Sequence, residues 1–361
     1  MKAVAVFPAE RRFEVIDHPE PHIDSPTQVK LRMLDVGICG TDKEIVAFEY
    51  GTPPQGSPYL ILGHESLGEV VEVGPQVSGI KSGDLAVPTV RRPCGLPGCV
   101  ACEAERQDFC YTGKFTERGI NRRHGFMAEY VVEEARYVNP VPAALRDVAV
   151  LVEPLTIAEK AVTQLWEVQK RLPWGTSHRA VVLGGGPVGL LGAMKLMLEG
   201  FDTTVYSRTP AAGDLATLVA GFGAKFVHAE TVTVADLAAQ MGNIDVVYEA
   251  VGASSLAFEV MPCLGVNGVF IFTGVPGRKG PISVDTDAIM RAHVLKNQII
   301  FGTVNASRQS FADAIADLGA FERRWPRAVG SLITGRFPID QVAKPLSGKI
   351  GGIKNVIAVH S

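Results

Sequence analysis

The stretch RAVVLGGGPVG, from Arg179 to Gly189, decides the fold of this chain. It begins with a short apolar run, and Gly184, Gly186 and Gly189 follow in the spacing G-x-G-x-x-G. The residues after it have helical periodicity, so the stretch predicts a strand, a tight turn and a helix. In such a unit the first glycine makes the turn, the second lets the backbone approach a pyrophosphate, and the third lets helix and strand pack closely. The pattern therefore predicts a dinucleotide site with the diphosphate at the helix N-terminus.

The sequence beyond this motif alternates between two kinds of segment. Short apolar runs follow in the order TTVYS, AKFVHA, IDVVYEAVG and GVFIFTGV, and helix-like stretches lie between them. This alternation predicts an α/β fold, with a doubly wound parallel sheet covered by helices on both faces. The alternative, in which such a sheet carries a glycine turn that binds nothing, stays open at this point.

The end of the second strand distinguishes between the two dinucleotides. An NAD site usually has an acidic residue about 20 positions after the glycines, whereas an NADP site has an arginine near the 2′-phosphate. Here Ser207 can donate a hydrogen bond and Arg208 can pair with a phosphate. We expect NADP to be preferred and NAD to be tolerated; the alternative for Arg208 is a solvated loop charge. The residues expected to contact the cofactor are Gly184, Gly186, Pro187, Val188, Gly189, Ser207, Arg208, Ala250, Thr273, Val275 and Asn305.

Composition excludes several classes of protein. The chain has 361 residues, of which 47% are hydrophobic and 20% charged, and these values are typical of a globular protein with two domains. Its formal charge of -3 comes with no basic run, so neither a nucleic acid nor an anionic membrane is an expected partner. The sequence shows no targeting signature and no apolar run of membrane-spanning length, and the expected location is the cytoplasm.

The first third of the chain reads as β-rich, and no nucleotide-binding pattern appears before residue 180. We therefore expect a separate catalytic domain there. Apolar periodicity from Leu145 to Arg171 predicts one helix that connects it to the nucleotide domain. The last strand, KNVIAVHS, has no partner in its own neighbourhood and is expected to return to the first domain. The expected bounds are 1–155 with 306–361 for the catalytic domain and 156–305 for the nucleotide domain.

Four of the six cysteines lie in one short segment. Cys94, Cys99, Cys102 and Cys110 have the spacing C-x4-C-x2-C-x7-C, in a stretch that is rich in Gly and Pro at one end. Four thiolates at such a spacing can close a tetrahedral structural zinc site in a protruding loop. A reactive redox cluster is the alternative. Because a closed four-sulfur site has no open coordination position, its role would be to order the loop.

A second set of candidate metal ligands is spread over the chain. Cys39 lies in GICGTD, His64 and Glu65 lie in GHE, and Glu153 lies in LVEPL. Thiolate, imidazole and carboxylate are the ligand types of a catalytic zinc, which takes three protein ligands and leaves one position for water or substrate. These residues lie far apart, and spacing alone favours Cys39 as a small buried apolar residue and GHE as an ordinary turn.

The order of these segments along the chain is specific. The GICGTD cysteine, GHESLGEVVEVG, the four cysteines, EPL and VVLGGGPVGLLG resemble, in that order, the zinc-dependent medium-chain dehydrogenase/reductase superfamily over nearly the whole chain. Within it, ICGTDKEIV, VRRPC, HGFMAEY, EPLTIAEKA and GTVNAS look most like the glucose (aldose) 1-dehydrogenases. The resemblance implies a GroES-like β-rich catalytic domain, a Rossmann domain, and an active zinc in the cleft between them.

The resemblance also implies roles for individual residues. It carries over Cys39, His64 and Glu153 as ligands of the catalytic zinc, with Glu65 as an exchangeable ligand or a nearby carboxylate, which reverses the preference from spacing alone. Thr41 matches the hydroxyl that contacts the reacting substrate oxygen. The positions that line the sugar or nicotinamide pocket match Glu117, Glu153, His293 and Asn305.

Two departures from the glucose-dehydrogenase pattern concern the substrate. The pattern can place Asn before the paired arginines and Asp four residues after the EPL glutamate, where this chain has Val90 and Ile157. An apolar side chain cannot hold a hydroxyl, so the pocket is expected to prefer other sugars or to accept a less hydroxylated alcohol. The cysteine loop also has two more residues after Cys94 than the usual C-x2-C-x2-C, which makes Cys94 the ligand in doubt.

The leading hypothesis is an NADP-preferring, zinc-dependent glucose (aldose) 1-dehydrogenase that oxidises the anomeric hydroxyl to a lactone. The alternative is a zinc-dependent secondary-alcohol or polyol dehydrogenase, which Val90 and Ile157 favour. The ligand set Cys39, His64 and Glu153 argues against a non-catalytic NADPH-binding protein and against a zinc-free quinone reductase. The expected partner besides the sugar or alcohol substrate is a second copy of the chain, as a homotetramer or, next, a dimer.

Overall fold

The computed structural model describes residues 1–208, 215–277, 280–348 and 350–360. The chain divides into two units, which we call the β unit and the α/β unit. The β unit comprises Met1–Thr156, Asn305–Glu322 and Leu332–Ser361, and the α/β unit comprises Ile157–Val304 and Arg323–Ser331. No helix within the described ranges is long and apolar enough to cross a bilayer. The domain bounds expected from the sequence stay a prediction, which limited proteolysis would test.

The β unit consists of three sheets. Their strand orders are β2-β1-β4, β11-β6-β5-β3-β19-β18 and β7-β8-β9, and β10 also pairs with β3. The strands are β1 (Lys2–Phe7), β2 (Arg12–Asp17), β3 (Gln28–Gly37), β4 (Leu60–Ile61), β5 (Glu65–Val73), β6 (Leu85–Pro88), β7 (Arg91–Arg92), β8 (Thr116–Arg118), β9 (Arg122–Arg123), β10 (Tyr130–Glu134), β11 (Val138–Val141), β18 (Ile333–Pro338) and β19 (Lys354–Ala358). The helices of this unit that matter here are α1 (Gly40–Val46), α2 (Val100–Glu103), α9 (Arg308–Arg324) and α11 (Ala343–Ser347).

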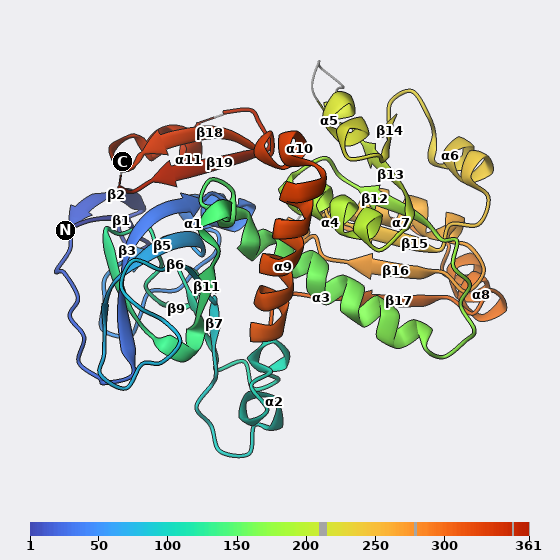
Figure 1. The fold of residues 1–361 in the computed structure, drawn as a ribbon. Helices are drawn as coiled ribbons and strands as arrows, with labels where there is room; N and C mark the ends of the chain where they lie inside the picture. The colour runs from blue at the N-terminus through green and yellow to red at the C-terminus, as the bar shows by residue number, and fades with distance from the viewer. Residues whose placement is uncertain (209–214, 278–279, 349, 361) are drawn as a thin grey trace. The chain divides into compact units, whose positions relative to one another are not determined.

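The last strand of the chain belongs to the largest sheet of the β unit. β19 pairs antiparallel with β3, with Val356 opposite Gly37 and Ala358 opposite Asp35, and β18 pairs parallel with β19. Figure 1 shows these red strands beside the blue N-terminal strands. The tail of the chain thus returns to its first part, and β3 becomes a central strand that is buried along most of its length.

The α/β unit contains one parallel sheet with the strand order β14-β13-β12-β15-β16-β17. This order confirms the doubly wound fold predicted from the alternating pattern. Its strands read as continuous apolar runs because helices cover both faces of the sheet. The strands are β12 (Arg179–Leu183), β13 (Asp202–Ser207), β14 (Lys225–His228), β15 (Val246–Glu249), β16 (Val269–Phe272) and β17 (Ile299–Gly302). The helices are α4 (Pro187–Leu198), α5 (Leu215–Gly221), α6 (Val234–Met241), α7 (Ser254–Val260), α8 (Thr286–Leu295) and α10 (Pro326–Gly330).

The connecting helix is shorter than its apolar periodicity predicts. α3 spans Val152–Gln169, whereas the pattern predicted a helix from Leu145 to Arg171. The reason is Pro154, which lacks a backbone N–H and fits only in the first turn of a helix. A helix that began at Leu145 would place this proline in its interior, where its ring clashes with the carbonyl of Val150. The proline therefore fixes where the helix begins.

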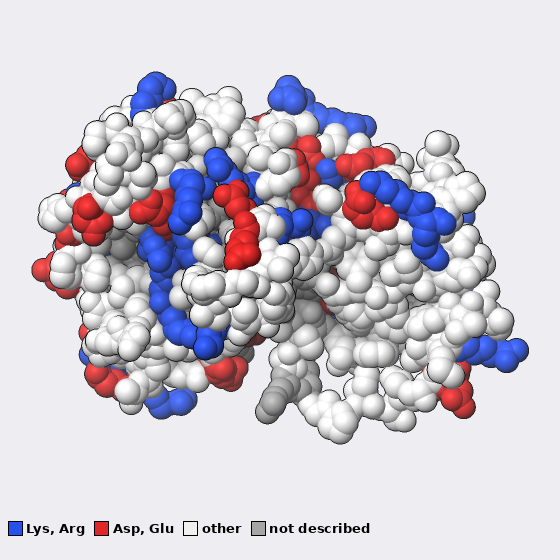
Figure 2. All heavy atoms as spheres, turned by 90° about the horizontal axis from the view of Figure 1, so that it is seen from below, with Lys and Arg blue, Asp and Glu red and all other residues white. Residues whose placement is uncertain are grey.

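Charge on the surface is mixed in sign. On the face shown in Figure 2, Lys and Arg side chains form a band over one part, and Asp and Glu side chains lie near it. Uncharged residues make up most of the remaining surface in this view. This mixture agrees with the small formal charge of -3.

Candidate active site

Three of the expected zinc ligands come together in the β unit. The ligand atoms of Cys39, His64 and Glu65 all lie within 4.8 Å of one another. Cys39 is the N-cap of α1, and Glu65 begins β5 directly opposite Gly37 of β3. A Cβ atom on Gly37 would clash with Oε2 of Glu65, so a larger residue here would force this carboxylate to move. Thiolate, imidazole and carboxylate at this separation fit a zinc ion with an open position.

Asp42 orients two of these residues. Its side chain is fully buried, the backbone N–H of Cys39 donates to its Oδ2 at 2.8 Å, and its Oδ1 lies 3.5 Å from Nδ1 of His64. A carboxylate facing Nδ1 leaves Nε2 of the ring for a metal. Burial opposes charge on His64, but Asp42 and Cys39 outweigh it and raise the pKa of His64 well above its ordinary value. Since a metal binds the neutral ring, binding must displace that proton. The sequence analysis missed Asp42, although it lies in the GICGTD segment.

Glu65 forms a buried ion pair with Lys354. Nζ of Lys354 donates to Oε2 of Glu65 at 2.5 Å and to the carbonyl oxygen of Ile38 at 3.1 Å. Both charged side chains are at most 2% exposed. Burial alone would lower the pKa of Lys354, but the carboxylate of Glu65 outweighs it and raises this pKa. The lysine is therefore charged, and it holds one carboxylate oxygen of Glu65.

Glu153 and Thr41 lie at the edge of this cluster. Glu153 is in the first turn of α3, and it is not one of the three residues whose ligand atoms are mutually within 4.8 Å. Burial raises the pKa of Glu153 to about 7, with a further contribution from Glu65, while His64 lowers it. Oγ1 of Thr41 lies 3.9 Å from Sγ of Cys39.

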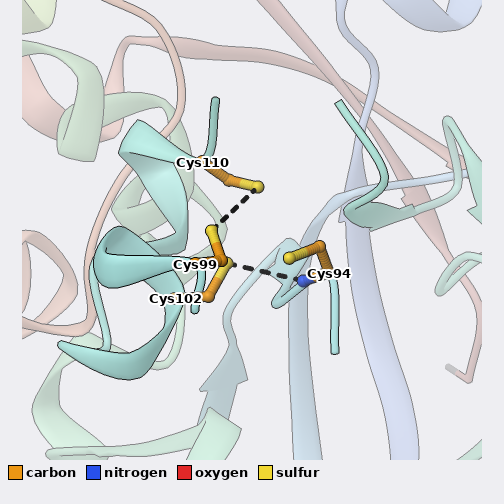
Figure 3. Close-up of side chains that lie close together, drawn as sticks. All are labelled: Cys94, Cys99, Cys102 and Cys110. Atoms are coloured by element: carbon orange, nitrogen blue, oxygen red, sulfur yellow. Dashed lines mark hydrogen bonds between the residues drawn. The ribbon is translucent and has the colours of Figure 1, made fainter. Parts of the chain in front are cut away.

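The four cysteines form a second cluster, in a loop of residues 94–110 that we call the four-cysteine loop. All four sulfur atoms lie within 4.8 Å of one another, and Figure 3 shows the side chains pointing toward one another. Sγ of Cys99 and Sγ of Cys110 are 3.9 Å apart, close to the separation of about 3.8 Å that tetrahedral zinc–sulfur bonds impose. Hydrogen bonding to Thr112 lowers the pKa of Cys94 to about 6. The structure thus brings Cys94 to the other three despite its longer spacing, and the set fits a closed zinc site.

Glu117 and Asn305, two of the expected pocket residues, are bonded to each other. Nδ2 of Asn305 donates to Oε1 of Glu117 at 2.9 Å, and Nε and Nη2 of Arg91 donate to the same oxygen at 3.0 and 2.9 Å. No hydrogen bond reaches Oε2 of Glu117 from the residues that the structure describes. Asn305 has a φ of 60°, a left-handed conformation that asparagine tolerates. The sequence predicted Glu117 and Asn305 as pocket residues, but Arg91 was not among the predicted residues.

His293 belongs to the α/β unit. It lies near the end of α8, and its Nδ1 is 2.8 Å from Oε1 of Gln298. The amide nitrogen of Gln298 donates to the carbonyl oxygens of Leu264 and Gly265. The ring of His293 therefore contacts Gln298, which in turn binds the segment that precedes β16, and the predicted place of His293 in the substrate pocket stays a prediction.

The glycine turn has the geometry that a pyrophosphate site requires. Gly184 has a φ of +111°, which L side chains rarely adopt. A Cβ on Gly189 would lie 2.3 Å from the carbonyl oxygen of Gly184, so helix and strand could not approach as they do. A Cβ on Gly186 would meet no atom within 4 Å, which leaves that face of the turn open. Pro187 and Val188 then begin α4, whose first N–H groups point out of the turn.

The other predicted cofactor residues lie at the carboxyl ends of the parallel strands. Ser207 ends β13 and is buried, and Arg208 follows it and is exposed. Oε1 of Glu249, at the end of β15, accepts hydrogen bonds from the backbone N–H groups of Val251 and Gly252, both at 2.8 Å. This buried carboxylate fixes the loop that carries Ala250, and sequence reasoning missed it. The positions Ala250, Thr273 and Val275 follow β15 and β16 at the same edge of the sheet.

Comparison with known proteins matches both parts of the chain. Residues 25–143 match the alcohol dehydrogenase GroES-like domain, and residues 146–359 match the glucose dehydrogenase C-terminus. The glucose 1-dehydrogenase of Methanocella arvoryzae is 36% identical, with 99% of each chain covered. The glucose 1-dehydrogenase of Thermoproteus tenax is 38% identical, with 100% of each chain covered.

Solved structures agree with the sequence relatives. The glucose dehydrogenase of Haloferax mediterranei, in complex with NADP, Zn and gluconolactone, has a TM-score of 0.90 and 30% identity, with 100% of both chains covered. The galactitol-1-phosphate dehydrogenase of Escherichia coli has a TM-score of 0.79 at 20% identity, which shows a shared fold only. From these full-length matches we conclude that the chain belongs to the glucose 1-dehydrogenase family of zinc-dependent medium-chain dehydrogenases.

Proposed function

We propose that this chain is a zinc-dependent glucose (aldose) 1-dehydrogenase that transfers hydride from the anomeric carbon to NADP and forms a lactone. The observation that carries the proposal is the open donor set of Cys39, His64 and Glu65 in the unit that also holds Glu117 and Asn305. Three ligand types with an open position suit catalysis, whereas a four-sulfur set suits structure.

The residues around the open set would share the work of proton removal. Zinc, when bound there, would act as a Lewis acid that lowers the pKa of the substrate hydroxyl. Cys39 and His64 would hold it with Glu153, and Asp42 would fix the imidazole. The ion pair with Lys354 holds Glu65 in the set, where it would be an exchangeable ligand beside Glu153. Thr41, beside the Cys39 sulfur, would accept the hydroxyl proton and pass it outward.

Recognition of the sugar would use the free side of Glu117. Oε1 of this carboxylate is occupied by Arg91 and Asn305, while Oε2 can accept a hydrogen bond from a hydroxyl. A buried acceptor held in one orientation discriminates strongly against a substrate that lacks the hydroxyl. Hydroxyl-rich substrates are therefore favoured over simple alcohols.

The cofactor would bind the glycine turn of the α/β unit. NADP receives the hydride, and the chain supplies the open face at Gly186 and the N-terminus of α4 for its diphosphate. The exposed guanidinium of Arg208, beside Ser207, suits the 2′-phosphate. An Arg208→Ala variant would raise the KM for NADP at least tenfold and leave the KM for NAD within twofold. An Arg179→Ala variant is the matched control, because Arg179 begins the neighbouring strand β12, at the edge of the sheet opposite to the end of β13 that Arg208 follows.

The experiment that tests the function is the initial rate of NADP reduction with D-glucose, D-galactose, D-xylose, sorbitol and simple secondary alcohols, with and without a chelator. Fast, chelator-sensitive oxidation of an aldose supports the proposal, and identification of a lactone product completes it. Turnover of polyols or alcohols alone would contradict it.

A polyol or secondary-alcohol dehydrogenase is the second candidate, because Val90 and Ile157 replace residues suited to hydroxyls. In the structure Val90 is 3% exposed, so its apolar side chain offers almost no surface to a substrate. This burial weakens the case for a less hydroxylated substrate at that position.

Assembly and location remain proposals. The α8 helix has no buried residue, and Met290, Val294 and Leu295 on it are 64–70% exposed. It lies in the same unit as β17, the terminal strand of the parallel sheet. Exposed apolar side chains beside a sheet edge favour a contact between copies, so we propose a homo-oligomer, a tetramer or a dimer. Light scattering of the purified chain would decide, and fractionation of cells would test the cytoplasmic location.

A further inference from the structure

Arg91 is a buried arginine that contacts two separate parts of the β unit. Its side chain is 7% exposed, and its guanidinium lies 3.8 Å from the ring centroid of Phe115. On one side it donates twice to Oε1 of Glu117. On the other side its Nη1 donates to the carbonyl oxygens of Gln107 and Asp108, at 3.4 and 3.2 Å. One rigid group therefore bridges the two parts.

The second contact of Arg91 is part of the four-cysteine loop. Gln107 and Asp108 form the short helical turn η1 (Gln107–Phe109), which leads directly into Cys110. The carbonyl oxygen of Gln107 accepts from the backbone N–H of Cys110 at 3.1 Å as well as from Arg91. Nε2 of Gln107 lies 3.5 Å from the carbonyl oxygen of Arg91 and completes the link. The carbonyl oxygen of Gln107 thus binds both the backbone of Cys110 and the side chain of Arg91. In Figure 1 the loop around α2 projects away from the sheets of the unit, so this link joins a projection to the core.

We propose that Arg91 is a positioning residue through which the four-cysteine loop sets the sugar-binding carboxylate of Glu117. The proposal rests on the proposed function, in which Oε2 of Glu117 accepts a sugar hydroxyl. Arg91 and Asn305 together fix Oε1, and this fixes where Oε2 stands. A displacement of the loop moves Gln107 and Asp108, and the planar guanidinium transmits that displacement to the carboxylate. The four-sulfur site would then act on sugar affinity while its own sulfur atoms touch no substrate.

Arginine is required at this place because of its geometry. Its five N–H donors point in fixed directions from one plane, so it can bind a carboxylate and two carbonyls at the same time. A lysine carries the same charge on a single nitrogen and cannot span both sides. The Arg91→Lys variant therefore keeps the charge that neutralises Glu117 and removes the link.

The first arm of the test measures kinetics. In Arg91→Lys we expect the KM for glucose to rise at least tenfold, while kcat and the KM for NADP stay within twofold. The matched control is Arg106→Lys, because Arg106 lies in the same loop and its guanidinium contacts the carboxylate of Asp108 and the ring of Phe109, both within that loop. An unchanged KM for glucose in Arg91→Lys would overturn the proposal.

The second arm needs no turnover. Because coupling is reciprocal, a change at Glu117 must loosen the four-cysteine loop. In a His64→Ala background, where only the loop holds zinc, release of zinc to a chromogenic chelator is followed with Glu117→Gln, Arg91→Lys and Arg106→Lys. We expect the first two to speed release at least threefold and the control to leave it unchanged.

The two arms distinguish a failure of the proposed coupling between Glu117 and the four-cysteine loop from a failure of the proposed function. If Arg91→Lys speeds zinc release and Glu117→Gln does not, Arg91 anchors only the loop and the coupling is overturned. If the wild-type chain oxidises no aldose, the proposed function fails, and the zinc-release arm still decides whether Glu117 and the loop are coupled.

Discussion

Two buried carboxylates of the β unit, Glu133 and Glu117, are bound by arginines. They differ in whether both carboxylate oxygens or only one are occupied. Glu133, with a fully buried side chain, receives Arg92 and Arg118 on Oε2 and Arg123 on Oε1. Among the residues that the structure describes, Glu117 accepts hydrogen bonds from Arg91 and Asn305, all on Oε1. A carboxylate bound on both oxygens can only hold structure together, whereas one with a free oxygen can also accept a ligand.

The two cysteine-containing clusters differ in the same way. The four-cysteine loop brings four sulfur atoms within 4.8 Å of one another and could complete a tetrahedral zinc site by itself. Cys39, His64 and Glu65 supply a smaller, mixed set. We expect Glu133 and the four-cysteine loop to contribute mainly to stability. We expect Glu117 and the set of Cys39, His64 and Glu65 to contribute mainly to catalysis, and the following variants test this division.

The largest effect is expected at the open metal cluster. His64→Ala should lower kcat/KM at least 10⁴-fold, about 5.5 kcal/mol, because the chemistry depends on this ligand. Zinc content should fall from two to one per chain, and the melting temperature should change little. Cys102→Ser is the matched variant of the closed cluster, and it should lower the melting temperature while kcat stays within threefold. Equal losses of stability in both variants would remove the distinction.

The next largest effect is expected at Glu133, the carboxylate that is bound on both oxygens. Glu133→Gln leaves three arginines around a neutral group, and loss of one partner from a buried ion pair costs about 3–5 kcal/mol. Urea unfolding at pH 7 would show a correspondingly lower free energy of unfolding. The catalytic KM values of the molecules that remain folded should be unchanged.

Acid titration sharpens this prediction. Burial alone would raise the pKa of Glu133, but Arg118 and Arg92 outweigh it and hold this pKa well below its usual range. A carboxyl with a depressed folded pKa contributes stability that is fully present above its unfolded pKa of about 4.3 and is lost as the pH falls below that value. The difference in unfolding free energy between wild type and Glu133→Gln should therefore shrink as the pH falls below about 4. A difference that is constant down to pH 3 would assign the acid dependence to other groups.

Substitution of Glu117, whose Oε2 can accept a ligand, should affect catalysis more than stability. Glu117→Gln should lower kcat/KM for glucose about 100-fold, which corresponds to about 2.7 kcal/mol, because a neutral amide is a weaker acceptor for a sugar hydroxyl. Its free energy of unfolding should fall by less than that of Glu133→Gln. Steady-state kinetics and urea unfolding on the same preparations give both values. A loss of stability without a loss of sugar affinity would place Glu117 with Glu133.

The smallest effect is expected at Tyr50. Burial and the nearby charge of Glu117 raise the pKa of this phenol, yet the residue is 54% exposed. Tyr50→Phe should change the KM for glucose no more than threefold, because an exposed hydroxyl exchanges readily with water. A larger change would add Tyr50 to the residues that bind the sugar.

Local patterns in the sequence predicted much of this architecture. The glycine turn, each single strand of the parallel sheet and the cysteine spacing are encoded in short local segments, and the structure has the predicted α/β sheet. The start of α3 could also have been read from Pro154, if the limit that proline places on a helix had been applied. The candidate ligands Cys39, His64 and Glu153 depended on the resemblance, since their spacing alone favoured an ordinary core.

The partners of the charged residues could not be predicted in this way. Arg91 and Arg92 are adjacent in β7, so their side chains point to opposite faces, and Arg91 lies opposite Glu117 only because of the register with β8. Lys354 is 289 residues from Glu65, and both lie in strands whose pairing the sequence does not specify. Register and long-range pairing are set by the packing of the whole unit.

The pairing of β19 with β3 has a consequence for synthesis. A ribosome makes β3 long before β19, so the largest sheet lacks an internal strand until β19 has been synthesised. Most of the α/β unit, by contrast, emerges as one continuous segment and can fold during elongation. Lys354 is the first residue of β19, so Glu65 lacks this ion-pair partner until β19 has been synthesised. The ion pair between Glu65 and Lys354 can therefore form only after β19 has been made, and a chain that stops before β19 would keep the α/β unit and lack this ion pair.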